Sequence, residues 1–295
     1  MKKTLITGAT GELGSLIINF LNKKNSTSDI AVLVRDTKSK KALQYAAQGF
    51  DVRQGDYNDP DSLIKAFKGI EQLFLVSGND IEARIHQHEN VIKSAIENQV
   101  EHILYTSTVR KIEDSSSPLF PVVNSHRLTE ESIIASGMNY TILRHNLYAE
   151  VIPLFIGGKE QILQTKNIFL PSENGKSNFV TRKDLAEAEA NILTEPEHHK
   201  NKIYKFNGNE ALNFEKISRL LSEILKARVT YLSPNINTFE STMKNTGLPS
   251  EIIGMLTMFS LGIAAGEFEK EKSDLEIILG RKAQSIKTFL QETYI

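Results

Sequence analysis

Near its N-terminus the chain reads Thr4-Leu5-Ile6-Thr7-Gly8-Ala9-Thr10-Gly11-Glu12-Leu13-Gly14. A short apolar run is followed by three glycines at a spacing of three, and a helical pattern comes next. Gly8 permits a tight turn because it has no Cβ, and Gly14 permits a helix to pack closely. The free N–H groups and the dipole of that helix then favour a phosphate. The stretch predicts a strand, a phosphate-binding turn and a helix.

Apolar runs and helical patterns alternate through the first half of the chain. The expected strands are residues 4–8, 30–35, 51–56, 72–77, 102–107 and 140–145, and the expected helices are 12–24, 38–48, 60–68, 82–98 and 125–136. Continuous apolar runs are typical of strands that helices cover on both faces. We therefore predict an α/β fold, a doubly wound parallel-sheet Rossmann fold.

The pattern changes after Arg144. A helix is expected at 184–193, a strand at 203–206 that rejoins the first sheet, a strand at 229–232 and a turn at 173–175, with helices dominating from residue 213. We expect an NAD(P)-binding Rossmann domain at 1–145, completed by a strand and a helix within about 179–208. Residues 146–178 and 209–295 would form a smaller, mostly helical C-terminal lobe that binds substrate.

Charge and composition exclude several classes of protein. The formal charge is −1, with 35 basic and 36 acidic side chains, so nothing indicates binding to nucleic acid or an anionic membrane. There is no cysteine, which excludes disulfides, thiol catalysis and thiolate metal sites. Residues 252–266 follow Glu251 and carry no charge, but this stretch is too short to span a bilayer. We expect a cytoplasmic location, and we leave open whether the chain forms a homodimer.

The end of the second expected strand bears on the choice of cofactor. Arg35 stands where an acid would bind the 2′-hydroxyl of NAD(H), and an arginine suits the 2′-phosphate of NADP(H). Lys38 adds charge, whereas Asp36 would favour NAD(H) after a small shift in register. We expect NADP(H) in preference to NAD(H). The expected cofactor-binding residues are Gly8, Thr10, Gly11, Glu12, Leu13, Gly14, Arg35, Lys38, Asp56, Tyr57, Ser77, Gly78, Thr106 and His126.

Three of these residues have a specific expected role. Asp56 could accept from the adenine amino group, although helix capping by Asp56 or Asn58 is an equal alternative. Ser77 and Gly78 are small and would let the nucleotide ribose lie across the strand ends.

Several motifs carry a resemblance to a known family. They are Gly8-Ala9-Thr10-Gly11-x-Leu13-Gly14, Val34-Arg35, Gly55-Asp56-Tyr57, Gln87-His88-x-Asn90-Val91-Ile92, Tyr105-Thr106-Ser107, His126-x-x-x-Glu130, Tyr140-Thr141-Ile142-Leu143-Arg144, Thr181-Arg182-x-Asp184-Leu185-Ala186 and Leu279-Gly280-Arg281. The chain resembles the NmrA-like branch of the short-chain dehydrogenase/reductase superfamily, and within it the NADPH-dependent type-2 quinone oxidoreductases and triphenylmethane reductases. The resemblance implies hydride delivery from NADPH to a flat, conjugated, electron-poor acceptor.

The chain departs from the superfamily at its usual tyrosine and lysine. Counting back from Glu130, the lysine position is His126 and the tyrosine position is Val122, which has no proton to give. Carbonyl–alcohol chemistry and nucleotide-sugar epimerisation are therefore disfavoured. Quinones and dye cations need little acid help, because conjugation spreads the charge, so the protein mainly supplies proximity and excludes water.

The expected catalytic residues are His126, Thr106, Ser107 and Tyr148. His126 could bond the nicotinamide ribose or a quinone oxygen, or be a solvated helix-surface histidine. Thr106 and Ser107 end a central strand, where they could touch the nicotinamide. Asn146 and Tyr148 are the expected substrate-binding residues, with Tyr148 alternatively packed in the core.

No metal site is expected. His86 and His88 are two apart on a helix and face different ways, and His198-His199 has no carboxylate cluster beside it. Three functions follow in order of preference. They are an NADPH-dependent reductase of quinone-type acceptors, a non-catalytic NADP(H)-binding redox sensor, and an epimerase- or dehydratase-like enzyme, which Val122 disfavours.

Overall fold

The computed structural model describes residues 2–270 and 272–295 and contains a seven-stranded parallel sheet. The strand order is β3-β2-β1-β4-β5-β6-β8. The strands are β1 (Thr4–Ile6), β2 (Ile30–Val34), β3 (Asp51–Gln54), β4 (Gln72–Leu75), β5 (His102–Thr108), β6 (Asn139–His145) and β8 (Lys202–Phe206). All neighbouring pairs run parallel, which confirms the predicted doubly wound α/β fold.

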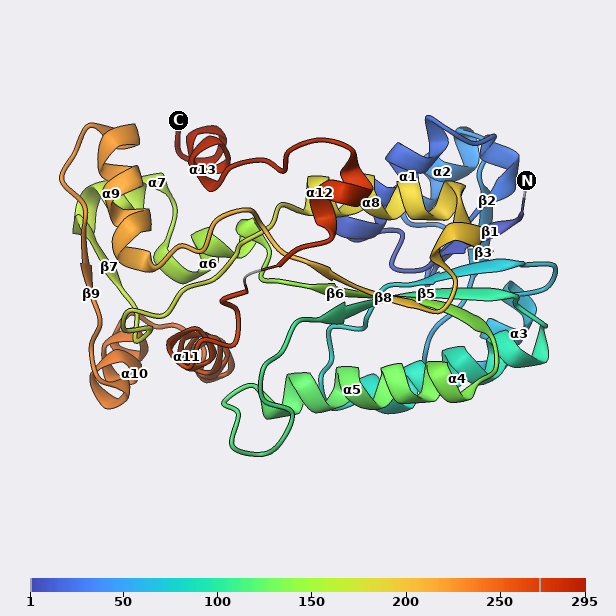
Figure 1. The fold of residues 1–295 in the computed structure, drawn as a ribbon, viewed down its shortest axis with the longest axis horizontal. Helices are drawn as coiled ribbons and strands as arrows, with labels where there is room; N and C mark the ends of the chain where they lie inside the picture. The colour runs from blue at the N-terminus through green and yellow to red at the C-terminus, as the bar shows by residue number, and fades with distance from the viewer. Residues whose placement is uncertain (1, 271) are drawn as a thin grey trace.

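Helices cover both faces of this sheet (Figure 1). One face carries α1 (Glu12–Asn22), α2 (Lys40–Ala47), α8 (Arg182–Thr194) and α12 (Leu275–Leu279), and the other carries α3 (Pro60–Ala66), α4 (Arg84–Glu97) and α5 (Phe120–Ala135). Every side chain of β2 is buried, as its continuous apolar run predicts. The Asp59 side chain accepts from Ser62 N and caps α3, whose first residue is Pro60.

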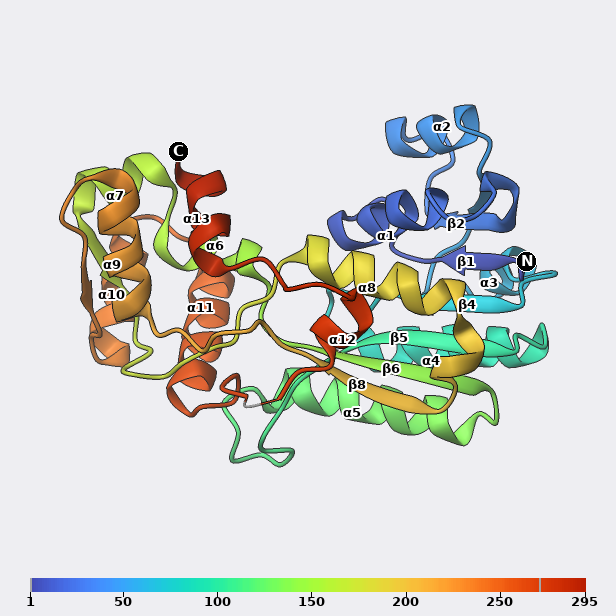
Figure 2. The ribbon, with the colours of Figure 1, turned by 45° about the horizontal axis from the view of Figure 1, so that its top comes forward.

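A smaller, mostly helical lobe lies beyond the sheet (Figure 2). Its helices are α6 (Ile152–Ile156), α7 (Lys159–Thr165), α9 (Phe214–Leu225), α10 (Ile236–Asn245), α11 (Ser250–Ala264) and α13 (Ile286–Tyr294). A two-stranded parallel sheet joins β7 (Asn167–Phe169) to β9 (Thr230–Leu232). Short 3₁₀ turns occur at Thr27–Asp29, Ala149–Val151 and Pro196–His199. The chain enters this lobe from the ends of β6 and β8, so the carboxyl ends of the parallel strands face it.

One local prediction needs correction, and one strand was not predicted. The helix expected to begin at residue 125 begins at Phe120, because Pro121 in the first turn is compatible with a helix. The strand β7 is too short to show a period, and it exists because β9 pairs with it from a distant part of the chain. Within the described residues, no helix combines the length and the hydropathy needed to cross a bilayer.

Candidate functional site

The glycine loop lies at the carboxyl end of β1 and leads directly into α1. Gly8 has a φ of +57°, a conformation that L side chains rarely adopt. A Cβ on Gly14 would lie 2.3 Å from Gly8 O, so helix and loop touch through backbone alone. Gly11 is the N-cap of α1 and supplies no side-chain acceptor, which leaves N–H groups of the first turn available. The loop can therefore receive a phosphate.

The remaining loop residues divide into exposed and buried groups. Thr10, Gly11 and Glu12 are exposed, whereas Leu13 packs into the core and offers only its backbone. Tyr45 of α2 donates to Ala9 O over 2.7 Å and holds the loop from behind. This arrangement fixes the loop while leaving its outer surface open.

Arg35 is exposed at the end of β2, and Lys38 is exposed after it. The carboxylate of Asp36 accepts from Lys38 N over 2.8 Å, and Ser39 caps α2. One carboxylate oxygen of Asp36 is thus used inside its own turn, whereas no hydrogen bond from another described residue holds the Arg35 guanidinium. This geometry supports a 2′-phosphate beside Arg35 better than a 2′-hydroxyl on Asp36.

Residues at the ends of β3 and β4 hold the loops together. Asp56 Oδ1 accepts from Asn58 N over 2.8 Å, and Asp59 rather than Asp56 or Asn58 caps α3, so the capping alternative is wrong. The Tyr57 hydroxyl bonds with Thr7 Oγ1 and donates to Val76 O, so it ties β1 to β4. Its hydroxyl faces the strand ends and is not free for a ligand.

Ser77 and Gly78 follow β4, and hydrogen bonds to β5 and to α4 hold their backbone. Ser77 N donates to Thr106 Oγ1 over 2.8 Å, so the Thr106 hydroxyl joins two strand ends and is 1% exposed. Gly78 N donates to His88 Nε2 over 3.0 Å, and Arg84 Nε donates to Gly78 O over 2.8 Å. The β4–α4 loop is therefore held rigidly beside the strand ends.

Sequence reasoning missed Arg84 and His88. They are four apart and share one face of α4, a spacing that could have shown them to act together. Burial and the charge of Arg84 lower the pKa of His88 to about 3, so this ring is neutral. Because its Nε2 accepts from Gly78 N, its proton lies on Nδ1, which faces Thr129 Oγ1 at 3.0 Å. Arg84 is buried and forms no ion pair with any described carboxylate.

His126 is buried on α5, one helical turn after Val122. Its Nδ1 lies 2.6 Å from the hydroxyl of Tyr105 in β5. Burial raises the pKa of Tyr105, and burial together with Arg84 lowers the pKa of His126, so both are neutral. With Tyr105 donating to Nδ1, the His126 proton is on Nε2. His126 can therefore donate a hydrogen bond but is a poor source of protons, and it is not the solvated histidine of the alternative reading.

Ser107 requires a correction. Its hydroxyl donates to Glu130 Oε1 over 2.5 Å, and the same carboxylate receives paired hydrogen bonds from Arg110 and Arg144. Burial opposes ionisation of Glu130, but the two guanidinium groups outweigh it and lower its pKa to about 2. The side chain of Ser107 therefore serves a buried ion-pair cluster, and its hydroxyl proton is not free for a nicotinamide.

Asn146 also requires a correction. Its Nδ2 donates to Asn207 Oδ1 over 2.8 Å and to Phe268 O over 2.9 Å. Its Oδ1 accepts from Leu147 N over 2.8 Å and from Ser177 Oγ over 3.1 Å. All the bonding capacity of this buried amide is used. Asn146 joins segments where the sheet meets the small lobe and has no group left for a substrate.

Tyr148 follows β6 and is partly buried. Its hydroxyl lies 3.2 Å from His145 Nδ1, and the guanidinium of Arg182 lies 4.7 Å above its ring. Arg182 is ion-paired with Glu12 over 2.7 Å, at the first turn of α1. Tyr148 is thereby placed beside the glycine loop. Sequence reasoning had noted Arg182 only as part of a motif.

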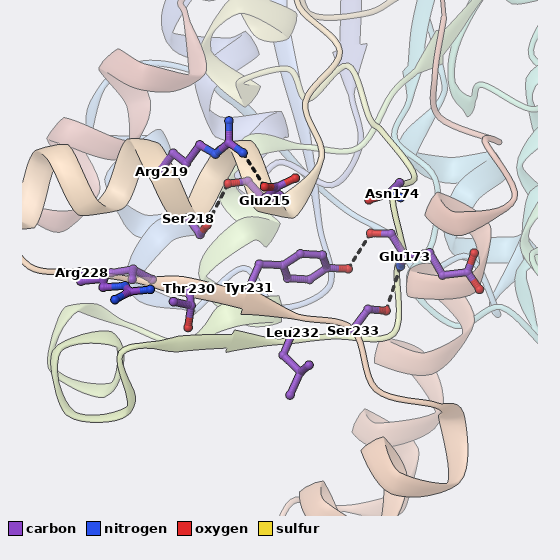
Figure 3. A pocket seen from close by; sticks show the side chains of 11 residues that line it. Glu173, Asn174, Glu215, Ser218, Arg219, Arg228, Thr230, Tyr231, Leu232 and Ser233 are labelled. Atoms are coloured by element: carbon purple, nitrogen blue, oxygen red, sulfur yellow. Dashed lines mark hydrogen bonds and ion pairs between the residues drawn. The ribbon is translucent and has the colours of Figure 1, made fainter.

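A separate cleft lies on the small lobe, between α9, β9 and the turn at 173–174 (Figure 3). Some of its polar groups are bonded to one another: Glu215 pairs with Arg219, and the Tyr231 hydroxyl donates to Glu173 O over 2.8 Å. Among residues 2–270 and 272–295, no three His, Cys, Asp or Glu side chains are grouped to hold a metal ion.

Comparison with known proteins agrees with this geometry. Residues 1–292 match the model of the NmrA-like family. The chain belongs to the NmrA-like family. It is 32% identical over 281 residues to quinone oxidoreductase 2 of Escherichia coli strain K12, covering 95% of each chain.

Two solved structures are similar over nearly the whole chain. A triphenylmethane reductase of Citrobacter sp., complexed with NADP(H), is 33% identical, with 99% of this chain and 100% of that chain covered and a TM-score of 0.89. An NADPH-dependent quinone oxidoreductase of Escherichia coli, complexed with NADPH, is 31% identical with the same coverage and a TM-score of 0.90. The family match and these two structures confirm the family and the fold that the sequence motifs predicted.

Proposed function

We propose that this NmrA-like chain is an NADPH-dependent oxidoreductase that delivers hydride to a quinone or a similar conjugated, electron-poor acceptor. The observation that carries the proposal is the open first turn of α1 behind Gly8 and Gly14, with Arg35 exposed at the next strand end. Relatives similar over nearly their full length are a quinone oxidoreductase and a triphenylmethane reductase, which supports the same reading.

The residues fit the dinucleotide in two parts. The backbone N–H groups of the glycine loop and the dipole of α1 would hold the diphosphate, and Arg35 with Lys38 would hold the 2′-phosphate. Arg182, already at the N-terminus of α1 through Glu12, is a third cation available to the diphosphate. When bound, NADPH supplies the hydride.

The lining of the strand ends supports reduction of a conjugated acceptor. Val122 is buried where the superfamily places its tyrosine, and His126 is held neutral. His126 Nε2 would donate to the nicotinamide ribose or to an acceptor oxygen, which orients the reactants. We retain His126 and Tyr148 as the candidate catalytic residues. The hydroxyls of Thr106 and Ser107 are engaged by Ser77 and Glu130, so we propose no catalytic role for them, and we propose no substrate contact for Asn146.

The test is direct. Purified protein is mixed with NADPH, or separately with NADH, and the absorbance of the reduced nicotinamide is followed with a panel of small quinones. Oxidation that depends on the acceptor and is faster with NADPH supports the proposal. Tight binding of NADPH with no oxidation of NADPH by any acceptor would instead favour the dinucleotide sensor.

A cytoplasmic location and a homodimer are also proposals. The absence of cysteine leaves the chain with no need for an oxidising compartment. Light scattering coupled to size-exclusion chromatography measures the mass in solution. A value near the 33.1 kDa of one chain would contradict the dimer.

A further inference from the structure

A buried glutamate lies behind Tyr148. Glu189 is on α8, is 0% exposed, and places Oε1 2.8 Å from His145 Nε2. Within the described residues, neither of its oxygens has a hydrogen-bond partner, and neither has His145 Nε2, so the 2.8 Å contact is a close approach of two buried polar groups. A carboxylate in an apolar core costs free energy unless it is paired, so this position is not explained by packing alone.

His145 connects the glutamate to the tyrosine. Its ring stacks on Phe206 at 6.0 Å with an interplanar angle of 6°, which fixes its orientation. Its other nitrogen, Nδ1, lies 3.2 Å from the Tyr148 hydroxyl. Carboxylate, imidazole and phenol are therefore joined in a row that runs from α8 through β6 to the loop after it.

The outer end of this row lies at the proposed site. Arg182 covers the Tyr148 ring at 4.7 Å and pairs with Glu12 at the start of α1. Tyr148 is the member of the row that Arg182 connects to the start of α1, whereas Glu189 and His145 are shut away from solvent.

We propose that Glu189 and His145 form a relay that supplies Tyr148 with the proton needed to reduce a quinone to a hydroquinone. This inference rests on the proposed function. NADPH, oxidised to NADP⁺, would supply the hydride and its electron pair, which form one O–H bond of the hydroquinone. The Tyr148 O–H bond breaks, and its proton forms the second O–H bond. His145 Nδ1 gives its proton to the Tyr148 oxygen while His145 Nε2 takes the proton of the Glu189 carboxyl group, and Glu189 regains a proton through Tyr148 and His145 after the product has left. Tyr148 is the catalytic residue, and His145 and Glu189 are positioning residues.

The charges around the row are compatible with this cycle. Burial raises the pKa of Tyr148, Glu189 and Glu150 raise it further, and Arg182 and Arg84 lower it. Burial also raises the pKa of Glu189, with His145 opposing the shift. Burial therefore favours a proton on Glu189.

Two acceptors separate proton supply from hydride transfer. 1,4-Benzoquinone needs a hydride and a proton to become a hydroquinone. A triphenylmethane dye cation such as crystal violet needs only a hydride, because the product is neutral. A relay matters for the first reaction and not for the second, whereas a general structural defect slows both.

The experiment compares Glu189→Gln and Tyr148→Phe with the wild-type chain on both acceptors, with NADPH in excess. We expect each variant to slow benzoquinone reduction about tenfold. This loss of rate is smaller than the usual effect of removing a general acid, because conjugated acceptors need little acid help. Dye reduction should change by less than about twofold. The control is Tyr204→Phe, which removes a similar hydroxyl, 2.8 Å from His199 Nδ1, on edge strand β8. It should alter neither rate.

A pH profile gives a second readout on the quinone alone. The wild-type quinone rate should fall as pH rises and Glu189 loses its proton, and this fall should be absent in Glu189→Gln, which has no titrating group at that position. The relay would be overturned if the variants slowed reduction of the quinone and of the dye equally. It would also be overturned if their quinone rate and its pH profile were the same as those of the wild type. If the wild-type chain fails to oxidise NADPH with every acceptor tested, the proposed function is refuted instead.

Discussion

The contact between Gly14 and Gly8 gives a sharp prediction about cofactor binding. In Gly14→Ala the new Cβ would lie 2.3 Å from Gly8 O and 2.8 Å from Gly8 C, whereas real Cβ atoms essentially never come within 3.0 Å of a heavy atom. Both neighbours are backbone atoms and cannot rotate away. Helix α1 and the glycine loop therefore have to separate by about 0.7 Å, a case of overpacking.

This displacement sets the size of the effect. A phosphate bond of about 2.9 Å from the first turn of α1 would lengthen to about 3.6 Å, beyond a useful hydrogen bond. Losing one bond to a charged group costs about 1.5–3 kcal/mol. The Kd for NADPH should therefore rise by roughly 10- to 100-fold. Overpacking itself should lower the free energy of unfolding by about 1–3 kcal/mol.

The assay is a fluorescence titration of NADPH with a thermal melt of the same samples. Gly254→Ala is the matched control, since Gly254 is in helix α11 and a Cβ there meets nothing within 4 Å. It should stabilise the chain by about 0.4–1 kcal/mol and leave the Kd unchanged. If Gly14→Ala binds NADPH as tightly as the wild type, the loop does not hold the diphosphate as argued.

Three further predictions test the site and its corrections. Arg35→Ala should weaken NADPH binding by about tenfold and leave NADH binding unchanged. Equal effects on both cofactors, or an effect as large in the exposed control Lys65→Ala, would contradict the placement of the 2′-phosphate. Glu130→Gln should cost about 3 kcal/mol at pH 7, because the pKa of Glu130 is lowered from 4.5 to about 2 in the folded chain. That contribution is fully present above the unfolded pKa and is lost as pH falls from about 5 towards 2, so urea melts of variant and wild type should converge near the acid end. A constant difference across this range would show that Glu130 does not titrate as described. Asn146→Ala should lower the free energy of unfolding by about 2–4 kcal/mol, since it leaves buried partners unsatisfied. The folded variant should keep the wild-type preference among quinones, and a changed preference would restore Asn146 as a substrate contact.

Local pattern was sufficient for most of the sheet and for the glycine loop. Strands buried on both faces are continuous apolar runs, and a phosphate-binding turn needs glycine at fixed spacing, so both features are written in neighbouring residues. The Asp59-Pro60 helix start is local in the same sense. The strand β7 was not predicted, because three residues have no measurable period and its partner β9 lies about sixty residues later.

The sequence by itself determined a doubly wound sheet, a dinucleotide-binding loop at its first turn, and a valine at position 122 in place of a proton-donating tyrosine. Only the tertiary structure decided which side chains at the strand ends are free to act. Ser107 and Asn146 stand at the right ends of strands, yet Glu130 and the Asn207 side chain use their polar groups. The row from Glu189 to Tyr148 joins residues more than forty positions apart. Such contacts form when α8 packs on the sheet, and they depend on distances between elements that no local period encodes.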